Sequence, residues 1–322
     1  MSSASQLNDK QLEAMKYVQG PLLVLAGAGS GKTSVITRKI AFLVQQCGIP
    51  AHRITAMTFT NKAAREMKER VGKLLSREEA KGLSVSTFHT FGLNLLRIEL
   101  KHLPLKANFS ILDADDCKRI LMDLMQRDNL SGAESKELIA KAMKKISDWK
   151  NDLVIPEQAH STCETPEDVQ LAHLYQLYER NLRAYNAVDF DDLIVMPTRL
   201  LQENAEVRDK WQNRVRYLLV DEYQDTNTAQ YTLVKLLVGV MGQFTAVGDD
   251  DQSIYAWRGA KPENMALLKD DFPNLKVIKL EQNYRSTSRI LKAANTVIGN
   301  NPHIFDKKLW SDKGHGEVIR VI

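Results

Sequence analysis

A glycine-rich stretch near the amino terminus carries the strongest chemical signal in the sequence. It reads Ala-Gly-Ala-Gly-Ser-Gly-Lys-Thr from Ala26 to Thr33 and matches the phosphate-binding P-loop pattern, except for alanine at the first glycine position. Because an apolar run precedes it, its backbone N–H groups can curl around phosphates, Lys32 can reach the β and γ oxygens, and the Thr33 hydroxyl can ligate Mg²⁺. The sequence therefore predicts a nucleoside triphosphate site, with a ligand-free glycine turn as the alternative. The residues expected there are Ala26, Gly27, Ala28, Gly29, Ser30, Gly31, Lys32, Thr33, Ser34 and Arg38.

An acidic pair follows a second apolar run. The run Tyr217 to Val220 indicates a strand that delivers Asp221 and Glu222 to its carboxyl end, where the ligands of open α/β sheets bind. We predict that Asp221 holds Mg²⁺ through water and that Glu222 orients and deprotonates an attacking water. An Asp-Glu pair after a strand is also typical of a solvated loop, so this prediction depends on the P-loop.

A third polar group follows the apolar run 243–247. Gln252 stands where the γ-phosphate of a bound nucleotide is expected, so it could sense that phosphate. Tyr255, Trp257 and Arg258 come next. Aromatic faces stack on nucleobases of any sequence at roughly 1–3 kcal/mol per base, and an adjacent arginine can bind a phosphate. The alternative is that the two aromatic side chains fill the core.

The spacing of apolar residues predicts the elements that must position these groups. Helices are expected at residues 7–18 and 61–75, and a further helix is expected to begin at residue 32. Strands are expected at residues 21–25, 53–59, 215–220, 243–247 and 275–280. An alternation of strands and helices predicts an α/β domain with a parallel sheet. Residues 91–186 have long helical patterns instead, so we expect a helical insertion that interrupts the sheet domain.

Composition excludes several classes of protein. The chain has 322 residues, 43% hydrophobic and 26% charged, which is typical of a soluble protein of two or three domains. Its three cysteines lie far apart without a CxxC pair, which argues against a metal cluster or a disulfide framework. The net charge of +4 permits a nucleic-acid partner without requiring one. Without a signal peptide or an apolar run of membrane length, we expect a cytoplasmic protein that binds no membrane.

Eight short stretches occur in a fixed order between residues 7 and 286. They are Leu7-Asn8 with Gln11, Ala26 to Thr33, Thr58 to Ala64, Ser86 to Thr90, Asp189 to Asp192, Asp221 to Asp225, Gly248 to Gly259 and Gln282 to Ser286. This ordered set resembles the superfamily 1 DNA helicases of the UvrD/Rep group. Within that group, residues 147–153 and 300–303 are most similar to the bacterial Rep branch.

The resemblance implies a P-loop NTPase (RecA-like) fold with a helical insertion domain. The ATP-binding motor domain, called 1A in the family, is expected at residues 1–90 and 188–278, and the helical insertion, 1B, at residues 91–187. Residues 279–322 would be the beginning of the second motor domain, 2A. Relatives continue with further motifs, so we expect this chain to be the amino-terminal part of a longer helicase.

The resemblance also implies roles for single residues. Gln11 stands where the family reads the adenine edge, Tyr284 where it stacks the adenine ring, and Arg285 matches the arginine that reaches the γ-phosphate. The implied catalytic residues are Lys32, Asp221, Glu222, Gln252 and Arg285, and the implied strand-binding residues are Phe59, Thr60, Asn61, His89, Phe190, Tyr255, Trp257 and Arg258. Core positions for Phe59 and Phe190, and a purely structural role for His89, are the alternatives.

The implied activity is that of an ATP-dependent helicase or translocase. It would use ATP and Mg²⁺ to move 3′ to 5′ along single-stranded DNA in replication or repair, with replication proteins as partners through regions outside these residues. A nucleotide- and DNA-binding module without productive hydrolysis is one alternative. A P-loop kinase is another, although it would need an arginine-rich lid and an acceptor pocket.

Overall fold

The computed structural model describes residues 7–127, 135–240, 242–256 and 259–320. Contacts divide the chain into two compact units, of which the first comprises residues 1–87, 210–226 and 237–322 and the second comprises residues 88–209 and 227–236. This division differs from the domain boundaries expected from the sequence, because residues 188–209 group with the helical unit and residues 279–322 group with the sheet. The three-domain assignment stays a prediction.

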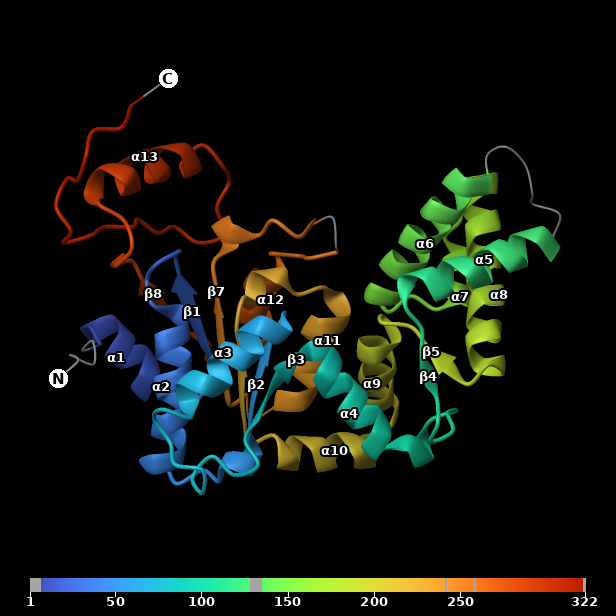
Figure 1. Ribbon diagram of the computed structural model, residues 1–322, viewed down its shortest axis with the longest axis horizontal. Coiled ribbons are helices and arrows are strands. Elements are labelled where there is room, and N and C mark those ends of the chain that lie inside the picture. Colours follow the sequence, from blue (N-terminus) through green and yellow to red (C-terminus); the bar gives the residue numbers. More distant parts are fainter. Residues whose placement is uncertain (1–6, 128–134, 241, 257–258, 321–322) are drawn as a thin grey trace. The chain divides into compact units, whose positions relative to one another are not determined.

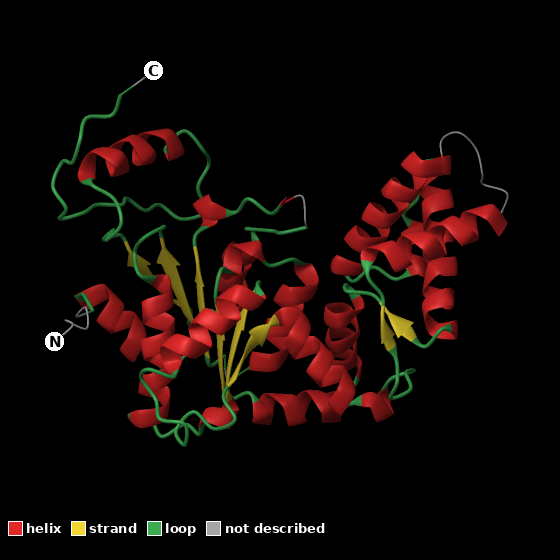
Figure 2. Ribbon diagram, in the orientation of Figure 1, coloured by secondary structure: helices red, strands yellow, loops and turns green. Residues whose placement is uncertain are grey.

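The first unit is built on a six-stranded parallel sheet (Figures 1 and 2). The strand order is β3-β2-β6-β7-β1-β8. The strands are β1 (Leu22–Ala26), β2 (Ile54–Thr58), β3 (Ser84–Thr87), β6 (Tyr217–Val220), β7 (Phe244–Gly248) and β8 (Lys276–Leu280). Parallel neighbours require crossover connections over the faces of the sheet. The predicted α/β class with a parallel sheet is therefore confirmed.

The first unit also contains several helices. Those of the first unit are α1 (Asp9–Lys16), α2 (Lys32–Gln45), α3 (Asn61–Val71), α12 (Asn264–Asp271) and α13 (Ser288–Ile298), while α10 (Ala205–Arg214) and α11 (Thr228–Val238) contain residues of both units. Short 3₁₀ turns follow two strands, η3 (Tyr223–Asp225) after β6 and η4 (Asp250–Gln252) after β7. Among the helices that the structure describes, none is long and apolar enough to cross a bilayer.

The central strands form because their residues are apolar on both faces. Every residue of β1, β6 and β7 is buried, as expected for a parallel sheet covered on both sides. On one face, Leu22 and Val24 share a core cluster with Ile36 of α2. On the other face, the ring of Phe244 lies edge-on to that of Phe272, at a centroid distance of 4.9 Å. Within these strands the buried hydroxyls of Tyr217 and Thr245 pair with each other, and charged side chains occur only beyond the strand ends.

The sequence did not predict β3. This edge strand reads Ser-Val-Ser-Thr from Ser84 to Thr87, which is too polar to indicate a strand by its apolar content. Its pairing with β2, with Ala56 opposite Val85, makes it a strand. The element therefore depends on a neighbour that lies far from it in the sequence.

The second unit is mainly helical. Its helices are α4 (Phe88–Ile98), α5 (Ala114–Arg127), α6 (Ser135–Asn151), α7 (Pro156–Ser161), α8 (Pro166–Ala184) and α9 (Asp192–Glu203), and β4 (Ser110–Ile111) pairs with β5 (Ala187–Val188). Side chains from α5, α6, α7 and α8 form one buried cluster. The helical character expected for residues 91–186 agrees with this arrangement.

A buried lysine joins three elements of the second unit. The Nζ atom of Lys150, at the end of α6, lies 2.7 Å from Glu179 and 2.8 Å from both Asp189 and Asp192. Only 1% of the Lys150 side chain is exposed. Burial favours the neutral amine, yet the surrounding carboxylates raise the pKa of Lys150 well above its ordinary value. The ammonium group therefore balances carboxylates that would otherwise repel one another.

We expect Lys150→Met to destabilise the chain strongly. Removing the ammonium leaves buried carboxylates without their cation, which typically costs about 3–5 kcal/mol. Urea unfolding measures this loss. The matched control is Lys141→Met on the same helix, because Lys141 is 49% exposed and pairs with Glu137 and Glu167 at the surface, where a pair contributes about 0–1 kcal/mol. Equal losses in both variants would contradict the proposed charge balance.

Candidate functional site

The predicted phosphate-binding loop connects β1 to α2 and adopts a backbone that requires glycine. Gly29 has φ 77° and Gly31 has φ 87°, in the left-handed region that glycine tolerates without strain. A Cβ on Gly31 would lie 2.6 Å from Nε2 of Gln11, and one on Gly29 would lie 2.7 Å from Cβ of Arg285. Gly31 is also the N-cap of α2, so the positive end of this helix faces the loop. This backbone fits a bound phosphate chain.

Gln11 lies against this loop. Its Nε2 atom donates to the carbonyl of Ser30 at 2.9 Å, and its side chain is 4% exposed. Asn8 and Gln11 cap the start of α1 reciprocally, and Nδ2 of Asn8 donates to the hydroxyl of Tyr284 at 2.7 Å. The two residues predicted to contact adenine are thus both held by Asn8, a residue for which the sequence suggested no role of its own.

Lys32 and Glu222, the predicted phosphate-binding lysine and general base, meet at the carboxyl edge of the sheet. Nζ of Lys32 lies 2.9 Å from a carboxylate oxygen of Glu222, with 11% and 38% of the two side chains exposed. Glu222 is the second residue after β6 and has φ 52° and ψ 45°, a left-handed conformation that strains a residue with a side chain. Strained backbone is typical of functional positions, where surrounding contacts keep it in place.

Asp221 is buried beside this pair. Burial raises its pKa to about 6, the charge of Glu222 adds to the increase, and Lys32 opposes it. One of its carboxylate oxygens accepts the N–H of Glu222 at 3.0 Å. A buried carboxylate is stabilised by a nearby cation, and the oxygen donors of Asp221 and Thr33 are of the type that Mg²⁺ prefers. These residues fit the predicted magnesium site.

Gln224 connects Glu222, the predicted base, to the loop after β7, and the sequence did not reveal this contact. Its Nε2 atom donates to Glu222 at 3.0 Å, and its Oε1 atom accepts the N–H of Asp249 at 3.0 Å. A Cβ on Gly248 would lie 2.7 Å from that Oε1 atom, so glycine permits the contact. Gln252 in turn donates to the carboxylate of Asp249. The only sequence signal was that Gln224 lies within the acidic stretch 221–225.

The segment after β8 also contacts the phosphate-binding loop. The N–H of Tyr284 donates to the carbonyl of Gly29 at 2.9 Å, and the side chain of Asn283 donates to the carbonyl of Ala28. Tyr284 is 42% exposed, and Arg285 is exposed as well. The structure therefore brings both residues next to the loop that they were predicted to serve.

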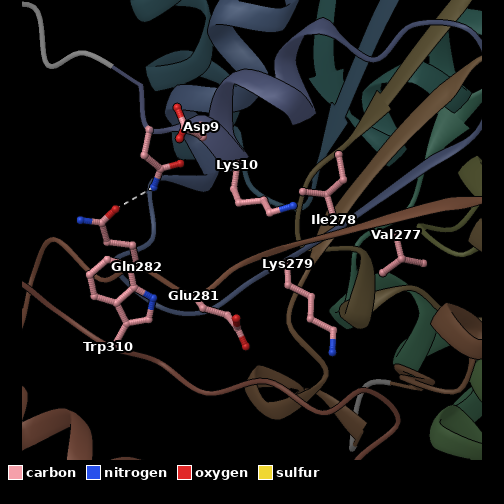
Figure 3. Close-up of a pocket in the computed structure, with 9 residues that line it drawn as sticks. Asp9, Lys10, Val277, Ile278, Lys279, Glu281, Gln282 and Trp310 are labelled. Carbon is pink, nitrogen blue, oxygen red and sulfur yellow. Dashed lines mark hydrogen bonds between the residues drawn. The ribbon is translucent and has the colours of Figure 1, made fainter.

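A cavity of about 670 Å³ lies beside this segment (Figure 3). Figure 3 shows Gln282 close to the indole of Trp310, and Nδ2 of Asn8 donates to Oε1 of Gln282 at 3.0 Å. The lining residues are Asn8, Asp9, Lys10, Val277, Ile278, Lys279, Glu281, Gln282 and Trp310. They belong to the start of α1, to edge strand β8 and to the segments that follow it, and none of them belongs to the phosphate-binding loop. The cavity is therefore separate from the expected position of the phosphates.

Several predicted strand-binding residues lie on the first unit. Thr60 and Asn61 are exposed at the start of α3, where the Thr60 hydroxyl caps the helix. Phe59 is half-buried, and Tyr255 is 37% exposed, so Tyr255 is not a core residue. Trp257 and Arg258, which were also predicted to bind the strand, lie outside the described residues.

Two predicted strand-binding residues, His89 and Phe190, lie together on the second unit. The rings of His89 and Phe190 are edge-on, at a centroid distance of 5.9 Å. Phe190 is 55% exposed, which excludes the alternative of a core position. Its neighbours Asp189 and Asp192 both bind Lys150, so the buried ion cluster holds the aromatic ring at the surface. Burial lowers the pKa of His89 and so favours the uncharged ring.

We expect Asp221→Asn to stabilise the nucleotide-free chain at neutral pH. Because the pKa of Asp221 is raised to about 6, the folded state binds this proton more tightly than the unfolded state does. The stabilisation of the folded state by this bound proton is complete below about pH 4 and is lost as the pH rises through 6. The variant avoids this loss, which for a shift of this size is about 2–3 kcal/mol.

Thermal unfolding from pH 4 to pH 8, without nucleotide or magnesium, measures this effect. The melting temperature of Asp221→Asn should exceed that of the unmodified chain at pH 8 and approach it at pH 4. Asp123→Asn on the exposed face of α5 is the control and should change neither value. A difference that does not depend on pH would contradict the assignment to Asp221.

Comparisons with known proteins agree with this geometry. The family model of the UvrD/REP helicase N-terminal domain matches residues 7–273, and that of the UvrD-like helicase C-terminal domain matches residues 278–322. The chain is 58% identical to ATP-dependent DNA helicase Rep of Escherichia coli, over 98% of this chain and 47% of the relative. It is 43% identical to ATP-dependent DNA helicase PcrA of Staphylococcus aureus, over 98% of this chain and 43% of the relative. The chain thus spans about half the length of these relatives, and it belongs to the UvrD/REP helicase family.

Proposed function

We propose that this chain is the ATP-hydrolysing part of a helicase that translocates 3′ to 5′ along single-stranded DNA. The observation that carries the proposal is the contact between Lys32 and Glu222 at the carboxyl edge of the sheet, beside buried Asp221. This arrangement supplies a cation for phosphates, a base for water and oxygen donors for a metal. The names of the similar proteins, ATP-dependent DNA helicases Rep and PcrA, support the same activity.

The ion pair suggests how nucleotide binding would prepare the base. In this structure Lys32 neutralises Glu222 at 2.9 Å. Phosphate oxygens would compete for the ammonium group, because charge-assisted hydrogen bonds to phosphate are strong. Glu222 would then accept a proton from water, and Gln224, which donates to it at 3.0 Å, would keep the carboxylate oriented. Mg²⁺, held by Asp221 and Thr33, would neutralise charge that develops on the phosphates.

Nucleotide selection and strand binding would use the residues around this centre. Gln11 and Tyr284, both bonded to Asn8, would contact the adenine ring. Arg285 would add positive charge at the γ-phosphate. Exposed Phe190 and Tyr255 are suited to stack on bases without sequence preference.

The two alternative functions, a P-loop kinase and a binding module without hydrolysis, are supported to different degrees. A P-loop kinase is disfavoured because the chain belongs to a helicase family. A binding module without productive hydrolysis is favoured by one observation, since the Lys32 ammonium group is already paired with the base. The cytoplasmic location and the contacts with replication proteins expected from the sequence stay predictions.

Replacing the base tests the proposal. We expect Glu222→Gln to lower the turnover number for ATP by about 100-fold or more, because the amide cannot accept the proton of the attacking water. ATP hydrolysis with Mg²⁺, with and without poly-deoxythymidine, measures this loss. The unmodified chain should be stimulated by the strand, and the variant should not.

Binding measurements separate the alternatives. Glu222→Gln should still bind a fluorescent ATP analogue, whereas Lys32→Ala should bind it about 10-fold or more weakly, since it lacks the phosphate contact. If the unmodified chain bound nucleotide and strand but hydrolysed ATP at background, the binding module would be the correct description.

The exposed aromatic ring of the second unit provides an independent prediction. We expect Phe190→Ala to weaken binding of a poly-deoxythymidine strand by about 5- to 150-fold, because a stacked base contributes roughly 1–3 kcal/mol. Fluorescence anisotropy of a labelled strand measures this change. Tyr185→Ala is the matched control, since Tyr185 is an aromatic residue of the same unit with 62% exposure and lies outside the eight motifs. Equal weakening by both substitutions would contradict a specific role for Phe190.

A further inference from the structure

A lysine outside the residues assigned above holds the loop that carries Gln252. Nζ of Lys307 lies 2.6 Å from Asp249, 2.7 Å from Asp250 and 2.6 Å from Asp251, and 5% of its side chain is exposed. Burial disfavours its charge, yet hydrogen bonds with the three carboxylates raise the pKa of Lys307 above its ordinary value. Because successive carboxylates repel one another, this compact loop depends on the lysine.

Residues just before Lys307 contact the same loop. The backbone N–H groups of Ile304 and Phe305 donate to Asp250 at 3.0 and 3.2 Å. Nδ1 of His303 lies 2.9 Å from Asp251. We call residues 249–252 the acidic loop and residues 303–310 the strap. The strap therefore attaches to the acidic loop through backbone and side-chain contacts, with the lysine at their centre.

The other end of the strap attaches to the segment that carries Arg285. The N–H of Trp310 donates to the carbonyl of Glu281 at 3.0 Å, and the N–H of Asn283 donates to the carbonyl of Trp310 at 2.7 Å. A Cβ on Gly27 would lie 2.5 Å from the side chain of Leu309, so the strap also touches the phosphate-binding loop. One short segment thus joins three parts of the candidate site.

We propose that Lys307 is a positioning residue that clamps the acidic loop to the strap and so keeps Gln252 in place to act on the γ-phosphate. Gln252 bonds to the carboxylate of Asp249, which Lys307 also binds. The Asp249 N–H bonds to Gln224, which reaches the base. The clamp therefore connects the γ-phosphate glutamine to the base and to Arg285. Its kinetic consequence rests on the proposed hydrolysis, whereas the clamp itself does not.

Amide hydrogen exchange tests the clamp in the intact chain without nucleotide. In Lys307→Met, amides of residues 249–252 should exchange about 10-fold faster, because the acidic loop loses its cation and opens locally. Lys307→Arg should restore slow exchange. Lys308→Met is the matched control, because this neighbouring side chain is exposed, and it should leave the exchange unchanged. Unchanged exchange in Lys307→Met would overturn the proposal.

Kinetics test the consequence for catalysis. In Lys307→Met, the turnover number of strand-stimulated ATP hydrolysis should fall about 10-fold while the affinity for a fluorescent ADP analogue changes less than about 3-fold, since the clamp orients groups that act on the γ-phosphate. Lys307→Arg should recover most of the turnover. Unaltered turnover, or an equal loss of ADP affinity, would contradict a positioning role. If the unmodified chain showed no strand-stimulated hydrolysis, the proposed function would fail, and the exchange measurement alone would decide the clamp.

Discussion

The carboxyl edge of one fully buried parallel sheet is the constraint on which the candidate site depends. Because β1, β6 and β7 are buried along their whole length, charged side chains are excluded from these strands and collect beyond their ends. Lys32 lies beyond β1, Glu222 beyond β6 and Gln252 beyond β7. Parallel strands place all of these ends at one edge. The predicted phosphate loop, base and phosphate sensor thus come to one edge although the sequence separates them by up to 220 residues.

Several features of this edge cost stability in the nucleotide-free protein. Burial of Asp221 disfavours its charge, and Glu222 has a strained left-handed backbone. Such costs are typical of sites organised for chemistry, and the surrounding structure must offset them. Here Lys32 pairs with Glu222 and Lys307 pairs with the acidic loop. The two lysines play related parts, since each places an ammonium group against carboxylates that follow a strand of the sheet.

Much of the fold could be predicted because the signals were local, and local signals also indicated the residues of the candidate nucleotide site. Apolar runs indicated the central strands, and the glycine-rich loop indicated a backbone whose left-handed residues, Gly29 and Gly31, are indeed glycines. Edge strand β3 was missed because pairing, not composition, makes it a strand. The role of Gln224 was missed because its partners follow different strands. Whether residues 279–322 form part of a separate domain stays untested, although their contacts group them with the sheet.

By itself the sequence determined which residues could do chemistry and which elements would carry them, since phosphate loops and buried strands are written in consecutive residues. Only the tertiary structure decided how these residues act on one another. It paired Lys32 with Glu222, buried Asp221, exposed Phe190 and surrounded Lys307 with three carboxylates. These outcomes depend on desolvation and on distances between residues remote in the chain. No local pattern encodes either quantity, because both arise only when the elements pack together.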